Sequence, residues 1–116
     1  MDIACLTDSL YLGQQVERAV ATLSQRFTLY HSVAALTRGL ERQDHNVILL
    51  SGDDDLIDAF LTSCARGGSS SKHRPSMILL SERDCGRLVE RALDAGIDDY
   101  LSIASGMAQL LPRIRA

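Results

Sequence analysis

The fold is decided by the stretch Ala92-Leu93-Asp94-Ala95-Gly96-Ile97-Asp98-Asp99-Tyr100-Leu101. Apolar residues at helical spacing run from Leu88 to Leu93, and Gly96 suits the C′ position just past the end of such a helix. The next residues, Asp98–Leu101, have the length and composition of a short strand. A helix that ends at a glycine and passes at once into a strand indicates a βαβ unit.

The same alternation runs through the rest of the chain. Four more apolar runs have strand length: Ile3–Leu6, Phe27–Tyr30, Val47–Leu50 and Met77–Leu80. Four more helices are predicted between and after these runs. Asp8 or Ser9 caps the first, whose apolar face is Leu12, Val16, Ala19, Val20 and Leu23, and Ser32 caps the second, which carries Leu36 and Leu40. The third covers Leu56–Ala65, and Ser105 caps the last, which carries Leu110, Leu111 and Ile114. Five strands that alternate with five helices predict an α/β fold with a parallel sheet.

Bulk properties place the chain among ordinary globular domains. Its 116 residues suggest one domain, 46% are hydrophobic, and the formal net charge of −3 argues against a nucleic-acid surface. No apolar stretch approaches the roughly 18–20 residues that span a bilayer, and the first residues lack the basic region of a signal peptide. We therefore expect a cytoplasmic protein whose three cysteines, Cys5, Cys64 and Cys85, are reduced.

Small polar residues follow the predicted strands. Thr7 and Asp8 come after the first strand, Ser51 after the third, Ser81 after the fourth and Ser102 after the fifth. Ligands and chemistry gather at the carboxyl ends of strands in a parallel sheet. These ends offer one carboxylate, several hydroxyls and no cation, a poor set for catalysis. We therefore expect no enzyme, no metal and no cofactor.

Over its whole length the chain resembles response-regulator receiver (CheY-like) domains. Residues 92–101 are close to that family's A-L-x-A-G-A-D-D-Y-L run, and residues 110–116 resemble its closing helix. The resemblance implies the flavodoxin-like (βα)5 fold, a doubly wound five-stranded parallel sheet with helices on both faces. It also implies a receiver-like domain over residues 1–116, the N-terminal domain of a longer signalling protein with a C-terminal output domain.

The family's phosphorylation chemistry requires five groups, and the resemblance places them on this chain. An acidic pair binds a divalent cation, an Asp accepts the phosphoryl group, and a hydroxyl and a Lys contact it. Here the matching positions hold Thr7 and Asp8, Ser51, Ser81 and Ile103. Ser51 cannot form an acyl phosphate, one carboxylate is a weak magnesium site, and Ile103 carries no charge. These losses indicate a degenerate pseudoreceiver.

Two alternatives stay open at this point. Asp53, Asp54 and Asp55 follow Ser51 and could, with Asp8, form a displaced acceptor and metal site, although a solvated acidic loop fits them better. An uncharged pocket of Thr7, Ser51, Ser81 and Ile103 could instead hold a small ligand. The three histidines, His31, His45 and His73, fall in predicted turns and are expected at the surface.

Association with proteins is the property of the family that remains. Receivers dimerise or meet output domains through the fourth helix, fifth strand and fifth helix. The charged residues of that surface are Arg87, Glu90, Arg91, Asp94, Asp98, Asp99, Arg113 and Arg115. Tyr100 matches the family's switch aromatic and is expected to hold one rotamer. The resulting hypothesis is a phosphorylation-independent interaction or dimerisation module of two-component-type signalling, with a protein partner or a second copy.

Overall fold

The computed structural model describes residues 2–22, 26–42, 45–52, 54–67, 75–81, 90, 93–94, 96–102 and 110–115. Within these ranges the side chains of residues 54, 63–67, 111, 113 and 115 are not described. The helix expected between Ser81 and Gly96 lies largely outside these residues, as do the loop before Ser76, the cap Ser105, and Leu23.

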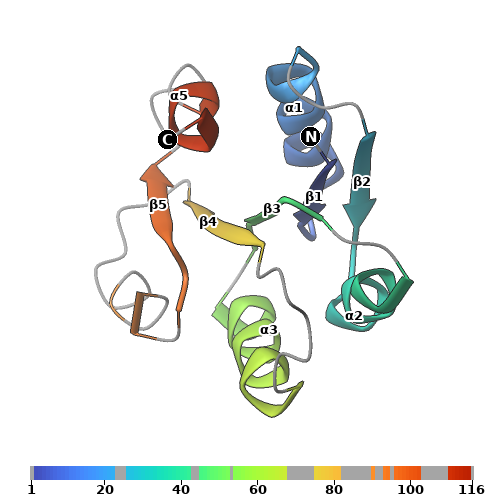
Figure 1. Ribbon diagram of the computed structural model, residues 1–116, viewed down its shortest axis with the longest axis vertical. Coiled ribbons are helices and arrows are strands. Elements are labelled where there is room, and N and C mark those ends of the chain that lie inside the picture. Colours follow the sequence, from blue (N-terminus) through green and yellow to red (C-terminus); the bar gives the residue numbers. More distant parts are fainter. Residues whose placement is uncertain are drawn as a thin grey trace.

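A five-stranded parallel sheet forms the centre of the molecule, with the strand order β2-β1-β3-β4-β5 (Figure 1). The strands are β1 (Asp2–Leu6), β2 (Arg26–Tyr30), β3 (Val47–Leu50), β4 (Ser76–Ser81) and β5 (Asp99–Ser102). This order confirms the predicted flavodoxin-like (βα)5 sheet. The central strands are apolar because helices cover both faces, which leaves no solvated side for polar residues.

Helices lie on both faces of the sheet (Figure 1). The described helices are α1 (Leu10–Val20), α2 (Val33–Arg42), α3 (Asp54–Gly67) and α5 (Leu110–Arg115). On one face, Ile3, Cys5 and Leu49 pack with residues of α1 and α5. On the other, alternate strand residues such as Leu6 and Ile48 pack with residues of α2 and α3. The two-residue period of each strand thus divides its side chains between two cores.

The fifth strand begins one residue later than its pattern predicts, at Asp99 rather than Asp98. The Asp98 carboxylate accepts a hydrogen bond from the Met77 backbone N–H at 2.8 Å, and the Asp98 N–H donates to the Met77 carbonyl at 2.9 Å. These bonds hold Asp98 against the start of β4 and aim the chain into β5. Gly96 has a φ of 106°, as its predicted place at the end of a helix requires.

Cys5 is fully buried in β1, as its apolar surroundings predict. Burial raises the pKa of its thiol from 9.0 to about 12. The thiol is therefore an inert apolar packing group near neutral pH. The side chains of Cys64 and Cys85 lie outside the described residues. No helix in the described part of the chain is both long and apolar enough to cross a membrane.

Candidate functional site

The carboxyl edge of the sheet brings the first predicted site residues together. Thr7 follows β1 and is fully buried, and Ser51 follows the neighbouring strand β3 and is 6% exposed. The Ser51 N–H donates to the Leu6 carbonyl at 2.9 Å, and the Thr7 N–H donates to the Tyr30 carbonyl at 3.1 Å. Ladder-like bonds thus fix both residues side by side at the end of β1.

The hydroxyls at this edge serve the start of α1. Thr7 Oγ1 accepts a hydrogen bond from the Ser9 N–H at 3.1 Å. Ser9 Oγ in turn accepts from the Leu12 N–H at 3.2 Å, so Ser9 is the N-cap of α1. Asp8 is exposed and does not cap the helix. The sequence left the cap open between Asp8 and Ser9. The structure assigns it to Ser9, because the Ser9 hydroxyl reaches the first turn.

Ser81 ends β4 and is half-buried at the same edge, one strand beyond Ser51. Ile103 lies outside the described residues, and so does Asp53. Asp54 begins α3, its side chain is not described, and Asp55 is exposed in the first turn of α3. Among the described residues, no three His, Cys, Asp or Glu side chains are grouped to hold a metal ion.

The candidate interface is described in part. Glu90, Asp94 and Asp98 are exposed, and Asp99 is half-buried with a carboxylate oxygen that accepts from the Tyr100 N–H at 2.7 Å. Leu93 stands beside Asp94 and is 48% exposed. The Tyr100 side chain packs against the core on the α2 and α3 face. Arg87 and Arg91, and the side chains of Arg113 and Arg115, lie outside the described residues.

A second polar group, which the sequence interpretation missed, lies toward the amino edge of the sheet. His45 Nδ1 lies 2.9 Å from Asp2 Oδ1, and His45 Nε2 lies 3.0 Å from the Tyr30 hydroxyl. The Tyr30 and His45 rings meet edge to face, with centroids 5.8 Å apart. We call this group the Asp2–His45–Tyr30 chain. His45 is 4% exposed, so its predicted surface position was wrong.

The hydrogen-bonding capacity of the three side chains sets which atom donates in each contact when His45 is neutral. An ionised carboxylate only accepts hydrogen bonds, so a neutral His45 carries its proton on Nδ1 and donates it to Asp2. Nε2 is then an acceptor, and the Tyr30 hydroxyl donates to it. Burial, with a smaller effect of the Asp2 charge, raises the pKa of the Tyr30 hydroxyl. Tyr30 therefore keeps the proton that this hydrogen bond needs.

The sequence contains an indication of this group, but it can be recognised only once the pairing of β1 with β3 is known. Ile3 pairs with Val47 in adjacent parallel strands, which places the residues just before them side by side. The Asp2 N–H donates to the Asn46 side chain at 2.7 Å, and the Asn46 N–H donates to the Asp2 carbonyl at 2.8 Å. His45 precedes Asn46, and this pairing brings its imidazole within hydrogen-bond distance of Asp2 in the interior. His31 is exposed as predicted, and His73 lies outside the described residues.

No protein-family model matches the sequence, and no curated protein matches it significantly. Solved structures do match. A CheY-like protein, TadZ, from Pseudomonas aeruginosa PAO1 superposes with a TM-score of 0.73 at 17% identity, over 97% of this chain and 95% of that one. An atypical orphan response regulator, reported to have a phosphorylation-independent regulatory mechanism, gives a TM-score of 0.76 at 15% identity, over 99% and 92%.

The response regulator RcsB from Salmonella typhimurium gives a TM-score of 0.80 at 14% identity. It matches over all of this chain, which spans 60% of the RcsB chain. At such low identities these likenesses establish the fold, and that fold is the one of CheY-like response-regulator receivers. The sequence resemblance to receivers is thereby confirmed at the level of architecture.

Proposed function

We propose that this chain is a phosphorylation-independent receiver-like domain, a pseudoreceiver, that acts as a protein-interaction or dimerisation module in two-component-type signalling. In this proposal the domain catalyses no reaction. It passes a signal by binding a second copy of itself, another protein, or an output domain of the same protein.

The residue after β3 carries this proposal. The family's acceptor Asp would stand at Ser51, which is 6% exposed, and its neighbour Thr7 has its hydroxyl committed to the start of α1. A serine hydroxyl cannot form an acyl phosphate. The carboxylate closest in sequence to this edge, Asp8, is exposed. One carboxylate is too little charge for the octahedral oxygen site that magnesium prefers.

Two structural neighbours are consistent with this reading. The atypical orphan response regulator is described as having a phosphorylation-independent regulatory mechanism, and a second orphan response regulator, HP1043 of H. pylori, superposes with a TM-score of 0.74 at 15% identity. The same architecture thus occurs in regulators that are described as orphans. For this chain the loss of the acceptor carboxylate is the stronger support.

The surface around Leu93 supports an interaction role. Leu93 is 48% exposed, and the acidic side chains of Glu90 and Asp94 are exposed within one helical turn of it. An apolar side chain surrounded by charged ones matches the apolar centre and polar rim of protein interfaces. The surface combines Leu93 and these carboxylates with the arginines that the sequence places nearby, so it can pair with itself across a two-fold axis.

The first experiment tests independence from phosphorylation. The domain is incubated with Mg²⁺ and either a small acyl phosphate or beryllofluoride, and uptake is followed by intact mass and by the NMR signals of residues 7–8 and 51. We expect no added phosphoryl group and no shift in those signals. Stoichiometric uptake that is lost in the Asp54→Ala variant would instead establish the displaced acceptor site.

The second experiment tests association. Sedimentation velocity over a range of concentrations should show a dimer that the Leu93→Asp and Glu90→Arg variants weaken by about tenfold. Glu17→Arg, an equally exposed change on α1, is the matched control and should leave the dimer intact. A monomer at every concentration would contradict self-association. Equal weakening by the control would contradict this surface as the interface.

A further inference from the structure

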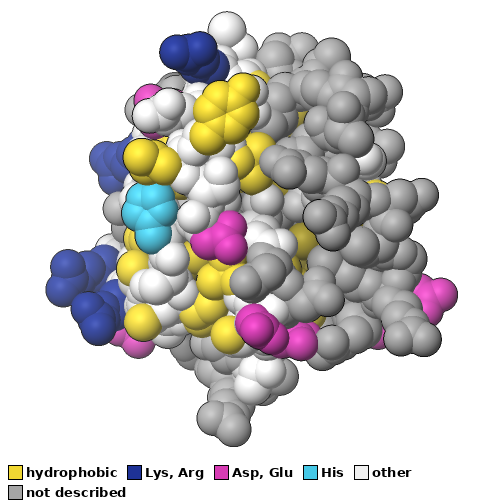
Figure 2. All heavy atoms as spheres, turned by 180° about the vertical axis from the view of Figure 1, so that it is seen from behind, with side chains coloured by type: hydrophobic (Ala, Val, Ile, Leu, Met, Phe, Trp, Pro, Cys, Tyr) yellow, Lys and Arg dark blue, Asp and Glu magenta, His cyan; other side chains and the backbone are white. Residues whose placement is uncertain are grey.

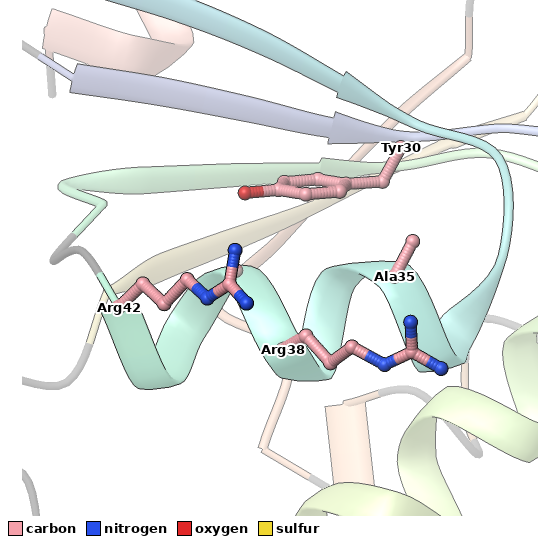
Figure 3. Close-up of a pocket in the computed structure, with 5 residues that line it drawn as sticks. Tyr30, Ala35, Arg38 and Arg42 are labelled. Atoms are coloured by element: carbon pink, nitrogen blue, oxygen red, sulfur yellow. The ribbon is translucent and has the colours of Figure 1, made fainter.

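A hollow lies between β2 and α2. It has a volume of about 350 Å³ and is lined by Tyr30, Ala35, Arg38, Gly39 and Arg42. Figure 3 shows the Tyr30 ring lying along α2, with Arg38 and Arg42 extending from successive turns of that helix. A hollow of this size is at the small end of the range of about 300–1,000 Å³ that small-molecule sites occupy.

Two cations stand at the rim of this hollow. Arg38 and Arg42 are four residues apart on α2, so they share one face, and both are exposed. Within the described part of the chain neither guanidinium has an ion pair with a carboxylate. Like charges at this spacing repel each other, and an anion bound between them would relieve that repulsion.

The basic side chains that the structure describes lie on neighbouring elements. Every Lys or Arg side chain that the structure describes lies on α1, β2 or α2, namely Arg18, Arg26, Arg38 and Arg42. Figure 2 shows the dark-blue side chains gathered along one edge of the molecule. Glu17 and Glu41 are exposed on α1 and α2, so this part of the surface carries both signs of charge.

The Tyr30 ring forms the inner wall of the hollow and is contacted from two sides. A Cβ on Gly39 would meet the Tyr30 hydroxyl at 2.0 Å, so the glycine is what lets the ring lie against the helix backbone. From behind, His45 Nε2 lies 3.0 Å from the Tyr30 hydroxyl, and His45 Nδ1 lies 2.9 Å from Asp2 Oδ1. A pre-positioned aromatic wall lowers the entropy that a ligand loses on binding.

We propose that this hollow binds a small phosphorylated molecule. The phosphate group lies between the Arg38 and Arg42 guanidinium groups, whose paired N–H donors match phosphate oxygens. The uncharged part of the molecule lies against the Tyr30 ring and the Ala35 methyl group. This proposal does not rest on the proposed function, because the residues that line the hollow include none of Thr7, Ser51 and Ser81 and none of the surface around Leu93.

Titration calorimetry on the 116-residue chain tests the proposal with adenosine, AMP, inorganic phosphate and pyrophosphate as probes. We expect AMP to bind with a Kd of about 1 mM or tighter, and about tenfold more tightly than adenosine. Phosphate and pyrophosphate should compete with AMP. Arg38→Gln and Arg42→Gln should each weaken AMP binding about tenfold, and the double variant should abolish it.

Controls separate this site from general charge effects. Arg18→Gln removes an equally exposed arginine from α1 and should leave AMP binding unchanged. Arg38→Lys keeps the charge but loses the paired donors, so it should give an intermediate affinity. The substituted arginines are exposed, so the thermal midpoints should stay near that of the parent chain.

Three results would overturn the proposal. The first is that none of the phosphate-bearing probes binds the parent chain. The second is that AMP binds equally well to the double variant or equally poorly to Arg18→Gln. The third is that a nucleic-acid oligomer binds through Arg38 and Arg42 while the small phosphates do not.

Discussion

The two edges of the sheet differ in the kind of polar group they hold. At the carboxyl edge, Thr7 and Ser9 offer short hydroxyls whose described hydrogen bonds reach no more than three residues along the chain. Toward the amino edge, the Asp2–His45–Tyr30 chain joins ionisable groups that are up to 43 residues apart. The side-chain bonds described at the carboxyl edge support a helix start, whereas those of the Asp2–His45–Tyr30 chain connect β1 and β2 through a residue that precedes β3. Among the described residues, the edge where receivers hold their charged phosphorylation groups thus has the simpler side-chain hydrogen bonds.

The largest expected effect is the loss of His45. His45→Ala removes the imidazole that contacts the Asp2 carboxylate and the Tyr30 hydroxyl and opens a cavity, so we expect a loss of about 3 kcal/mol in unfolding free energy. Urea denaturation measures it. His31→Ala, at an exposed histidine, is the control and should change stability by less than about 0.5 kcal/mol. If Ser51→Ala cost as much as His45→Ala, the contrast between the edges would fail.

Alkaline pH should weaken the core between the two edges. The folded-state pKa of the Cys5 thiol is raised to about 12 from 9.0, so the unfolded chain releases this proton first as the pH rises. This contribution to stability is therefore full below pH 9 and falls between pH 9 and 12, by roughly 3 kcal/mol at pH 11.

Denaturation measured from pH 8 to pH 11 checks this effect. Cys5→Ala removes the thiol and should flatten most of the fall. A smaller fall in the same direction should remain, because the pKa of Tyr30 is also raised. A parent chain whose stability did not change between pH 9 and pH 11 would contradict the burial of the thiol.

A carboxylate restored at position 51 tests whether the carboxyl edge contains a cation that can compensate its charge. Ser51→Asp places a charge at a position that is 6% exposed, with no described cation beside it, and should cost about 2 kcal/mol at pH 7. Ser51→Asn has nearly the same shape without the charge and serves as the control. Burial raises the pKa of the introduced carboxyl group above its usual value of about 3.9, so the difference between the two variants should shrink as the pH falls toward 4 and be nearly gone below it. An Asp variant that matched Asn at pH 7 would indicate an unrecognised cation at this edge.

The smallest expected effect distinguishes Asp8 from Ser9. Ser9→Ala removes the N-cap of α1 and should cost about 1 kcal/mol. Asp8→Ala removes an exposed carboxylate that does not cap the helix and should cost less than about 0.5 kcal/mol. Thermal unfolding followed by circular dichroism compares the two. The reverse order would reinstate Asp8 as a structural or ligand-binding residue.

Much of the architecture could be predicted because it depends on local patterns. The β3 run Val47–Leu50 has the predicted bounds, and Ser32 caps α2 as expected, with its hydroxyl accepting from the Ala35 N–H at 3.1 Å. The start of β5 was missed by one residue. That boundary depends on the Met77–Asp98 contact, and no local pattern reveals a bond between residues 21 positions apart.

The candidate site divides in the same way. The strand-end residues Thr7, Ser51 and Ser81 could be located because a parallel sheet aligns the ends of its strands. The burial of His45 could not be predicted from its turn-like surroundings. It follows from the parallel register of β1 and β3, which places His45 within reach of Asp2.

The sequence by itself determined the alternation of strands and helices, the two apolar cores and the absence of a carboxylate at Ser51. These properties are set by residue type and short-range period. The tertiary structure alone decided that His45 is buried between Asp2 and Tyr30, and that Gly39 lets the Tyr30 ring form the wall of a hollow beside two arginines. Those contacts form only when strands distant in sequence pair in register, so they contribute to stability only in the folded protein.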